Sequence, residues 1–431
     1  MAKGSHRSIA DGRERLIPLG ARLPGARFKA RSRMSRALVA ALEGLVVLDF
    51  TRLLPGPFCT QLLANLGADV IKIEDPALGD YMRSVPPLVD GTSYPFLMVN
   101  RGKRSLAVDL KTSEGQDILR QLSRRADVVV EQFRPGVMAR LGASYDDLAM
   151  MNPRIVYCSF SGYGQTGPYK DLPGHDLNFE ALAGILAVTR SGSDPRPAIP
   201  GVPIADLAGG FNAALAILAA LRTRDRTGRG EFIDLSIYDT TIALMVLGLA
   251  RYFATGEEPI AGETLLTGTF PFYALYETRD GRWLSVSAVE PKFWVRMCEL
   301  VGAPDLSERQ FAEEPDRAAV AEALAARFRE KTLAEWERLF EPERLPIAPV
   351  KRLPEVVEDP HVAARNLLPA VDIPGLGKRR VIAHPAKHAV TTTANPVRVP
   401  KKGEHTEEIL RSLGFSARQI TGLSKKGIVA R

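Results

Sequence analysis

Two residues of this 431-residue chain, His175 and Asp206, are candidates for proton transfer, and both precede helical sequence. His175 lies in the segment LPGHDLNFEALAG, between a Pro-Gly turn and an aspartate, and a neutral imidazole accepts a proton near pH 7. Asp206 precedes the apolar run LAGGFNAALAILAALRT. A carboxylate at the start of a buried helix lies near the positive end of the helix dipole, which predicts an ionised base or nucleophile. Spacing alone does not place His175 beside Asp206.

Helix capping is the alternative explanation for the carboxylates. Asp176 precedes Leu-Asn-Phe-Glu-Ala-Leu-Ala, and we interpret it as the cap of that short helix. Capping equally accounts for Asp206, so both interpretations stay open for that residue. For His175 the alternative is an ordinary, hydrogen-bonded polar side chain.

Basic residues lie within or beside the expected strands. Lys72 lies inside the strand-like DVIKIE, Arg104 precedes a strand, and Arg134 follows one. A charge inside an apolar strand requires an anion, and basic side chains at strand ends suit a phosphate-bearing ligand. A solvated surface is the alternative for any one of them.

Two other motifs have a simpler explanation. Gly162-Tyr-Gly-Gln-Thr-Gly167 matches G-x-G-x-x-G, but Pro168 follows at once and prevents the helix that would hold a pyrophosphate. A dinucleotide-dependent oxidoreductase is therefore only a remote alternative. Three separated cysteines, and the pair His384 and His388 without nearby carboxylates, give no metal-ligand spacing, so we expect no metal.

The charge distribution argues against a polyanion-binding surface. Residues 1–33 hold nine Lys/Arg and two acidic residues, which accounts for the whole net charge of +7. We therefore expect no nucleic-acid partner, and, lacking an uninterrupted apolar span, no membrane. The basic segment is expected to be a disordered extension, a presequence, or the product of a start placed upstream of Met34. The expected location is cytoplasmic, or mitochondrial if residues 1–33 are a presequence.

Short β-branched runs alternate with helical segments from Leu45 onward, which predicts an α/β fold with a parallel sheet in a Rossmann-like layer. We place this large domain at 42–239. Helices and a hairpin around Thr278-Arg-Asp-Gly281 predict a smaller α+β domain at 240–354. Residues 355–431 are expected to form a connecting arm and a C-terminal helix that returns to the large domain.

The chain resembles CoA-transferase family III, the CaiB/BaiF type, which includes α-methylacyl-CoA racemase. The resemblance runs from about Leu42 to the C-terminus, in the segments LLPGPFCTQLLANLGADVIKIE, NRGKRSLAVDLK, EQFRPGVMARLG, NPRIVYCSFSGYGQTGP, PGHDLNFEALAG, PIADLAGG, TGRGEFIDLSIYD and GEHTEEIL. It implies two interlocked subunits in a homodimer and acyl-CoA thioesters as substrates. It implies no permanently bound cofactor and no metal, with coenzyme A entering as part of the substrate.

The resemblance also implies site residues. In the racemases the positions matching His175 and Asp206 form the catalytic pair, with the glutamate matching Glu290 nearby; Lys72, Arg104 and Arg134 match CoA contacts. In the transferases Asp206 matches the nucleophile. Many transferases have Tyr or Ala where this chain has His175, and inversion at C2 of a branched acyl-CoA needs two bases. We therefore favour epimerisation, with CoA transfer through an aspartyl-CoA thioester as the alternative.

Overall fold

The structure, a computed structural model, describes residues 40–190, 196–262, 264–387 and 397–431. The basic segment 1–33 and His388 lie outside the described residues, so the expectations about them stay predictions.

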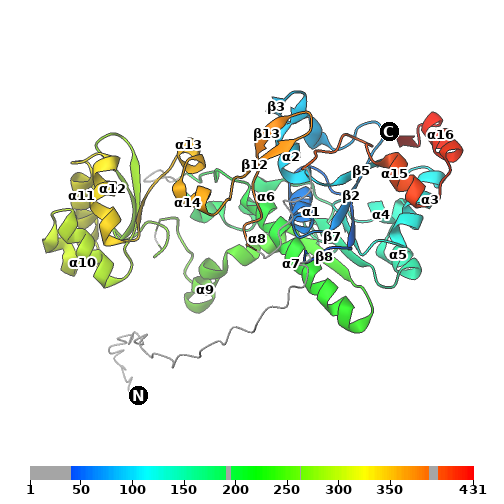
Figure 1. Ribbon diagram of the computed structural model, residues 1–431. Helices are drawn as coiled ribbons and strands as arrows, with labels where there is room; N and C mark the ends of the chain where they lie inside the picture. Colours follow the sequence, from blue (N-terminus) through cyan, green and yellow to red (C-terminus); the bar gives the residue numbers. More distant parts are fainter. Residues whose placement is uncertain (1–39, 191–195, 263, 388–396) are drawn as a thin grey trace, which may run out of the picture. The chain divides into compact units, whose positions relative to one another are not determined.

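A seven-stranded sheet organises the larger part of the fold, in the order β14-β5-β2-β1-β6-β7-β8 (Figure 1). All neighbouring strands are parallel except β14, which runs antiparallel to β5. The strands are β1 Val46–Asp49, β2 Asp69–Glu74, β5 Arg104–Val108, β6 Val128–Glu131, β7 Val156–Ser161, β8 Phe232–Ser236 and β14 Val429–Ala430. Every residue of β6 is buried, as expected for a strand covered on both faces. The predicted α/β fold with a parallel sheet is confirmed.

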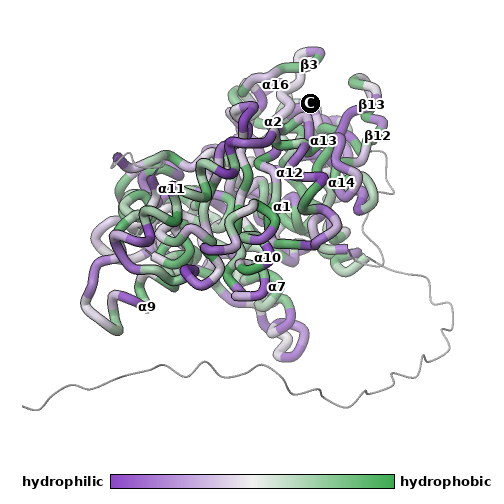
Figure 2. The backbone as a smooth tube through the Cα atoms, turned by 90° about the vertical axis from the view of Figure 1, so that its left-hand side faces the viewer, coloured by the Kyte–Doolittle hydropathy of each residue, from purple (hydrophilic) through white to green (hydrophobic). Residues whose placement is uncertain are grey.

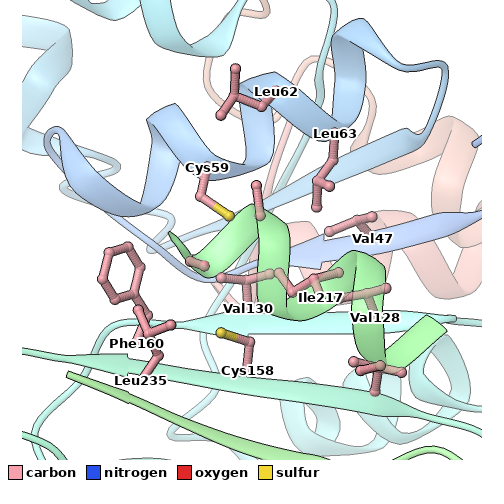
Figure 3. Packing of buried hydrophobic residues seen from close by; sticks show 14 of the residues in the cluster. Val47, Cys59, Leu62, Leu63, Val128, Val130, Cys158, Phe160, Ile217 and Leu235 are labelled. Atoms are coloured by element: carbon pink, nitrogen blue, oxygen red, sulfur yellow. The ribbon is translucent and has the colours of Figure 1, made fainter. Parts of the chain in front are cut away.

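Helices α1 (Pro55–Asn65) and α7 (Ile204–Thr227) contribute to the hydrophobic cluster on one face of this sheet. Figure 3 shows Leu63 of α1 and Ile217 of α7 among the valines of β1 and β6. Cys59 and Cys158 are buried in the same cluster, and Cys298 is buried elsewhere, so all three cysteines are free core residues. Close packing of α1 on α7 requires Gly210, where a Cβ atom would lie 2.8 Å from Phe58 Cδ1 and 2.9 Å from the Pro55 carbonyl oxygen.

The other face of the sheet is covered by α3 (Ser113–Ser123), α4 (Val137–Arg140), α5 (Tyr145–Met151), α15 (Thr406–Ser412) and α16 (Ala417–Lys425). Their apolar residues form a second cluster with the strands, to which Ile118, Leu148, Ile409 and Ile420 belong. Figure 1 shows α15 and α16, from the C-terminal part of the chain, beside α3. Helices α15 and α16 thus pack on the large sheet.

Helix α7 is longer than the apolar segment predicted from the sequence. Its length and hydropathy are those of a membrane-crossing helix. Helices α8 (Ile237–Leu244) and α9 (Val246–Thr255) also reach this length and hydropathy when they are taken together as one bent pair. Ala213, Ile217 and Leu221 of α7 are nevertheless buried against the sheet, so one side of the helix packs in the core, whereas Phe211 and Leu215 are exposed. The last turn of α7 holds two basic residues, Arg224 and Arg226. Figure 2 shows that hydrophilic and hydrophobic segments alternate along the described chain.

A smaller antiparallel sheet, β11-β10-β9, has its own hydrophobic cluster. It consists of β9 Tyr273–Glu277, β10 Trp283–Ser287 and β11 Ile347–Pro349, with the predicted hairpin turn at Gly281. Three helices pack on it: α10 Pro291–Leu300, α11 Asp316–Phe328 and α12 Leu333–Phe340. The domain boundaries at 239/240 and 354/355 stay predictions.

The remaining elements are short. They are β3 Leu88–Val89, β4 Thr92–Ser93, α2 Tyr94–Asn100, α6 Asp176–Leu182, α13 Leu353–Val357, α14 Pro360–Ala364, β12 Ala370–Ile373 and β13 Gly377–Arg380. Of these, α6 positions the candidate site because it packs against both α7 and α8.

Candidate active site

The amino end of α7 is capped by carboxylates of α6. Pro203 precedes α7 and supplies no side-chain cap. Instead, the Asp206 amide donates to Asp176 Oδ1 at 3.0 Å, and the Ile204 amide donates to Glu180 Oε1 at 3.3 Å. The first turn of a helix has N–H groups without partners inside the helix, and here a neighbouring helix satisfies two of them.

This arrangement changes the interpretation of both aspartates. Asp176 was predicted to cap its own helix, but His175 is the residue before α6, and Asp176 caps α7 instead. Asp206 is the third residue of α7, and its carboxyl accepts no hydrogen bond from the described residues. The capping explanation of Asp206 is therefore wrong, and its carboxyl is available for chemistry. The amides at the start of α7 are occupied, so they do not offer the oxyanion donors that a helix start would otherwise supply.

Asp206 has an unusually high pKa. Burial raises it from 3.8 to about 7, and the neighbouring carboxyls of Asp176 and Glu180 add to the effect. Burial and like charges therefore oppose the helix dipole, which was expected to keep this carboxylate ionised. Near neutral pH the carboxyl is present in both forms, so it can donate or accept a proton.

His175 lies on the rim of a cavity of about 280 Å³. The cavity is also lined by Arg134 and Lys170, by the end of β7 at Ser161 and Gly162, and by Phe179 of α6. His175 is exposed, and its backbone amide donates to Asn178 Oδ1 at 3.0 Å, which holds the start of α6. A histidine and two cations thus share one cavity at the carboxyl edge of the parallel strands, where α/β folds bind ligands.

The glycine-rich segment between β7 and α6 is a loop. Gly162 and Tyr163 line the same cavity. After β7 ends at Ser161, the next helix in the described chain is α6, which begins at Asp176. The segment therefore lacks the helix that a dinucleotide fingerprint requires, as Pro168 predicted.

Two of the three predicted CoA-binding cations have internal partners. Lys72 is fully buried, its Nζ lies 2.8 Å from Asp80 Oδ2, and it donates to the Thr51 carbonyl at 2.8 Å. Burial lowers the pKa of Lys72 but its acidic neighbours more than compensate, so the net pKa is raised. The anion that this strand lysine requires is Asp80, not a phosphate.

Arg104 is also committed within the protein, because it forms ion pairs with Asp69 and Glu408. It lies at the amino end of β5, whereas the cavity with His175 opens at the carboxyl edge of the sheet. The structure therefore contradicts Lys72 and Arg104 as free cations for a ligand. Arg134 is exposed on the cavity and forms no ion pair within the described chain, which fits the predicted role.

Glu290 is not brought to the other candidate residues. It is exposed and directly precedes α10, next to the small sheet. No hydrogen bond or ion pair connects it to His175 or Asp206 among the described residues. Its catalytic role stays a prediction. Among the described residues there is also no cluster of three His, Cys, Asp or Glu side chains that could hold a metal ion.

Sequence reasoning missed Glu180 and Lys170. Glu180 is fully buried and lies four residues after Asp176, a spacing that puts both side chains on one face of α6. That spacing was the available signal. Lys170 carried no signal beyond its place in the loop before His175.

Comparisons with known proteins agree over most of the chain. A model of CoA-transferase family III matches residues 42–406. The chain is 36% identical over 394 residues to alpha-methylacyl-CoA racemase of Homo sapiens, covering 90% of this chain and 97% of that protein. It is 35% identical over 395 residues to succinyl-CoA:glutarate CoA-transferase of Mus musculus, covering 90% of each. The crystal structure of a CAIB/BAIF family protein from Brucella suis matches with a TM-score of 0.75 and 29% identity, covering 87% of this chain and 99% of that one.

Proposed function

The chain belongs to CoA-transferase family III, and we propose that it epimerises C2 of a branched acyl-CoA. The relatives it matches include both CoA-transferases and racemases. The observation that carries this proposal is the Asp206 carboxyl, which caps nothing and has a pKa of about 7. Such a group can return a proton to carbon as readily as it removes one.

The reaction needs two groups on opposite faces of the substrate. One base takes the C2 proton of the thioester, the electron pair moves into the carbonyl to give an enolate, and an acid on the other face protonates C2. His175 and Asp206 supply these groups in our proposal. In one direction a neutral His175 imidazole is the base and a protonated Asp206 carboxyl is the acid. In the reverse direction the Asp206 carboxylate is the base and the His175 imidazolium is the acid.

The cavity with His175 supports binding of a CoA thioester. Arg134 follows β6, and Lys170 lies in the loop after β7, so two cations flank the carboxyl edge of the sheet. The six parallel strands follow the order of doubly wound nucleotide-binding folds, with their crossover beside β1, and we propose a Rossmann-like binding mode there. The guanidinium of Arg134 suits a phosphate of CoA.

CoA transfer is the second candidate, favoured by the relatives that are transferases. Here the ionised Asp206 attacks the thioester carbonyl and expels the CoA thiolate, which leaves a mixed anhydride. The thiolate then attacks the aspartyl carbonyl and releases the first carboxylate, so that CoA is held as an aspartyl thioester for the acceptor acid. This route has no need of His175.

We further propose that the enzyme is an interlocked homodimer. Helices α7 and α9 each expose large apolar side chains, among them Phe211 and Leu215 of α7 and Leu247 and Phe253 of α9. Large exposed apolar side chains of this kind are typical of a subunit interface when they gather in one patch. Light scattering on the wild type should give twice the chain mass, and the double variant Leu247→Glu/Phe253→Glu should reduce it.

The deciding experiment incubates the protein with (R)-2-methyldecanoyl-CoA in deuterated water. Epimerisation places deuterium at C2, and Asp206→Asn abolishes it. No exchange, combined with CoA transfer to an added carboxylic acid and hydroxylamine trapping at Asp206, would replace epimerisation by the transferase mechanism. Unchanged acyl-CoA chemistry in Asp206→Asn would remove both.

A further inference from the structure

A buried glutamate, Glu180, contacts the first turn of α7, which carries Asp206, and does not line the cavity that holds His175. Glu180 is 0% exposed, but unlike the buried Lys72, which pairs with Asp80, it has no ion-pair partner among the described residues. Its Oε1 accepts the Ile204 amide at 3.3 Å, whereas its Oε2 is buried and accepts from no group among the described residues.

Within the part of the chain that the structure describes, Glu180 forms no ion pair with a cation. The helices α6, α7 and α8 pack together at this corner, and their titratable side chains there are His175, Asp176, Asp206, Tyr238 and Asp239. Burial, a hydrogen bond with Asp176 and the Asp176 charge raise the pKa of Glu180, hydrogen bonds from the backbone amides of Ile204 and Ala205 lower it, and the net pKa is raised. A carboxylate with an unsatisfied buried oxygen is costly, but a carboxylic acid can donate that oxygen's proton to a neighbouring carboxylate.

We propose that Glu180 is a positioning residue, which keeps a proton in a buried carboxyl pair with Asp176 and so holds the start of α7 and the Asp206 carboxyl in place. The unsatisfied Oε2 becomes the protonated oxygen, which donates to Asp176. The other oxygens of the pair then accept the amides of Ile204 and Asp206. The two helices are joined by this pair at the residue that reacts.

The pair also controls the charge of Asp206. Asp176, Glu180 and Asp206 cannot all ionise in one buried corner, so the three carboxyls titrate as a coupled unit. Loss of the pair's proton opposes ionisation of Asp206, which keeps Asp206 able to carry a proton near neutral pH. The inference rests on the proposed function in one respect only, namely that Asp206 is the reacting carboxyl.

The first test is the pH profile of deuterium exchange into (R)-2-methyldecanoyl-CoA. Glu180→Gln keeps the shape and hydrogen bonds of the acid but cannot ionise. We expect its profile to shift to lower pH by about one unit and to become steeper, because the carboxyl whose proton loss would oppose ionisation of Asp206 is gone. Glu180→Asp retains the acid and should keep the broad wild-type profile. Glu322→Gln, on the exposed side of α11, is the matched control and should change nothing.

The second test needs no substrate, so it separates failure of this inference from failure of the proposed function. Infrared difference spectra between about pH 5 and pH 8 measure how many protonated carboxyls ionise. Glu131, whose pKa burial raises to about 7, contributes equally in all variants. The wild type and Glu180→Asp should lose more protonated-carboxyl signal than Glu180→Gln. Equal signal loss, or a Glu180→Gln profile that falls in height without moving along the pH axis, would reduce Glu180 to a structural residue and overturn the inference. A Glu180→Gln variant that does not fold leaves the spectra of Glu180→Asp to decide, since retention of the full signal supports the proton pair and its loss refutes it.

Discussion

Replacing Asp206 by asparagine should make the protein more stable at alkaline pH while removing its activity. In the wild type, burial and two neighbouring carboxyls raise the pKa of Asp206 from 3.8 to about 7. The folded protein therefore binds this proton more tightly than the unfolded chain. Its contribution to stability is complete below about pH 4, is lost as the pH rises toward 7, and stays lost above that. Asparagine is neutral at every pH and does not show this loss.

The size of the effect follows from the shift. About three pKa units at 1.36 kcal/mol each correspond to about 4 kcal/mol, and the partial exposure of Asp206 reduces this to about 2 kcal/mol. The Asp206 carboxyl accepts no hydrogen bond within the described chain, so the substitution removes none. For a chain of this length about 2 kcal/mol raises Tm by about 2 °C.

The measurement is urea or thermal denaturation of wild type and Asp206→Asn at about pH 4 and pH 8. Groups outside the coupled unit of Asp176, Glu180 and Asp206 titrate in both proteins and cancel in the difference. We expect near-equal stability at the lower pH and a gain for the variant at the higher one. A gain of the same size at both pH values, or a loss at pH 8, would refute the reasoning, because neither can come from an ionising carboxyl at this position.

Three further predictions concern packing and binding. Lys103 Nζ lies 2.9 Å from Asp49 Oδ2 and both are fully buried, so Lys103→Met should cost about 3–5 kcal/mol in urea denaturation; less than 1 kcal/mol would contradict a buried pair. Gly210→Ala forces a clash between α1 and α7 and should destabilise by about 1–3 kcal/mol. A Cβ atom at Gly422 would have no atom within 4 Å, so Gly422→Ala should stabilise the protein by about 0.4–1 kcal/mol. A Gly422→Ala variant less stable than Gly210→Ala would refute the packing argument. Arg134→Ala should weaken CoA binding about tenfold in calorimetry with an unchanged Tm, and undiminished affinity would remove Arg134 from the site.

Much of the sheet was predictable because its signals are local. A strand such as β6 is apolar on both faces, and this pattern indicates a parallel sheet whatever lies around it. The apolar sequence of α7 likewise indicated a helix that packs in the core, and it placed Asp206 in the first turn, where it is the third residue. The proline after the glycine-rich loop was enough to remove the dinucleotide fingerprint.

The partners of the charged side chains were not predictable, because they depend on packing between distant segments. Lys72 indicated a need for an anion, but the sequence did not say whether Asp80 or a ligand supplies it. The same holds for Asp176, whose acceptor oxygen serves an amide of another helix rather than its own. Propensity rules describe a cap within one helix and contain no term for a cap between two.

The pairing of β14 with β5 affects how the sheet can assemble. Val429 pairs with Val108, two residues far apart in sequence, and β14 covers the outer edge of β5 with only two residues. Until that segment docks, β5 presents unpaired backbone groups that can template association with another chain. Variants that loosen α15 or α16 are therefore expected to show their defect as aggregation during refolding before they show it as lost catalysis.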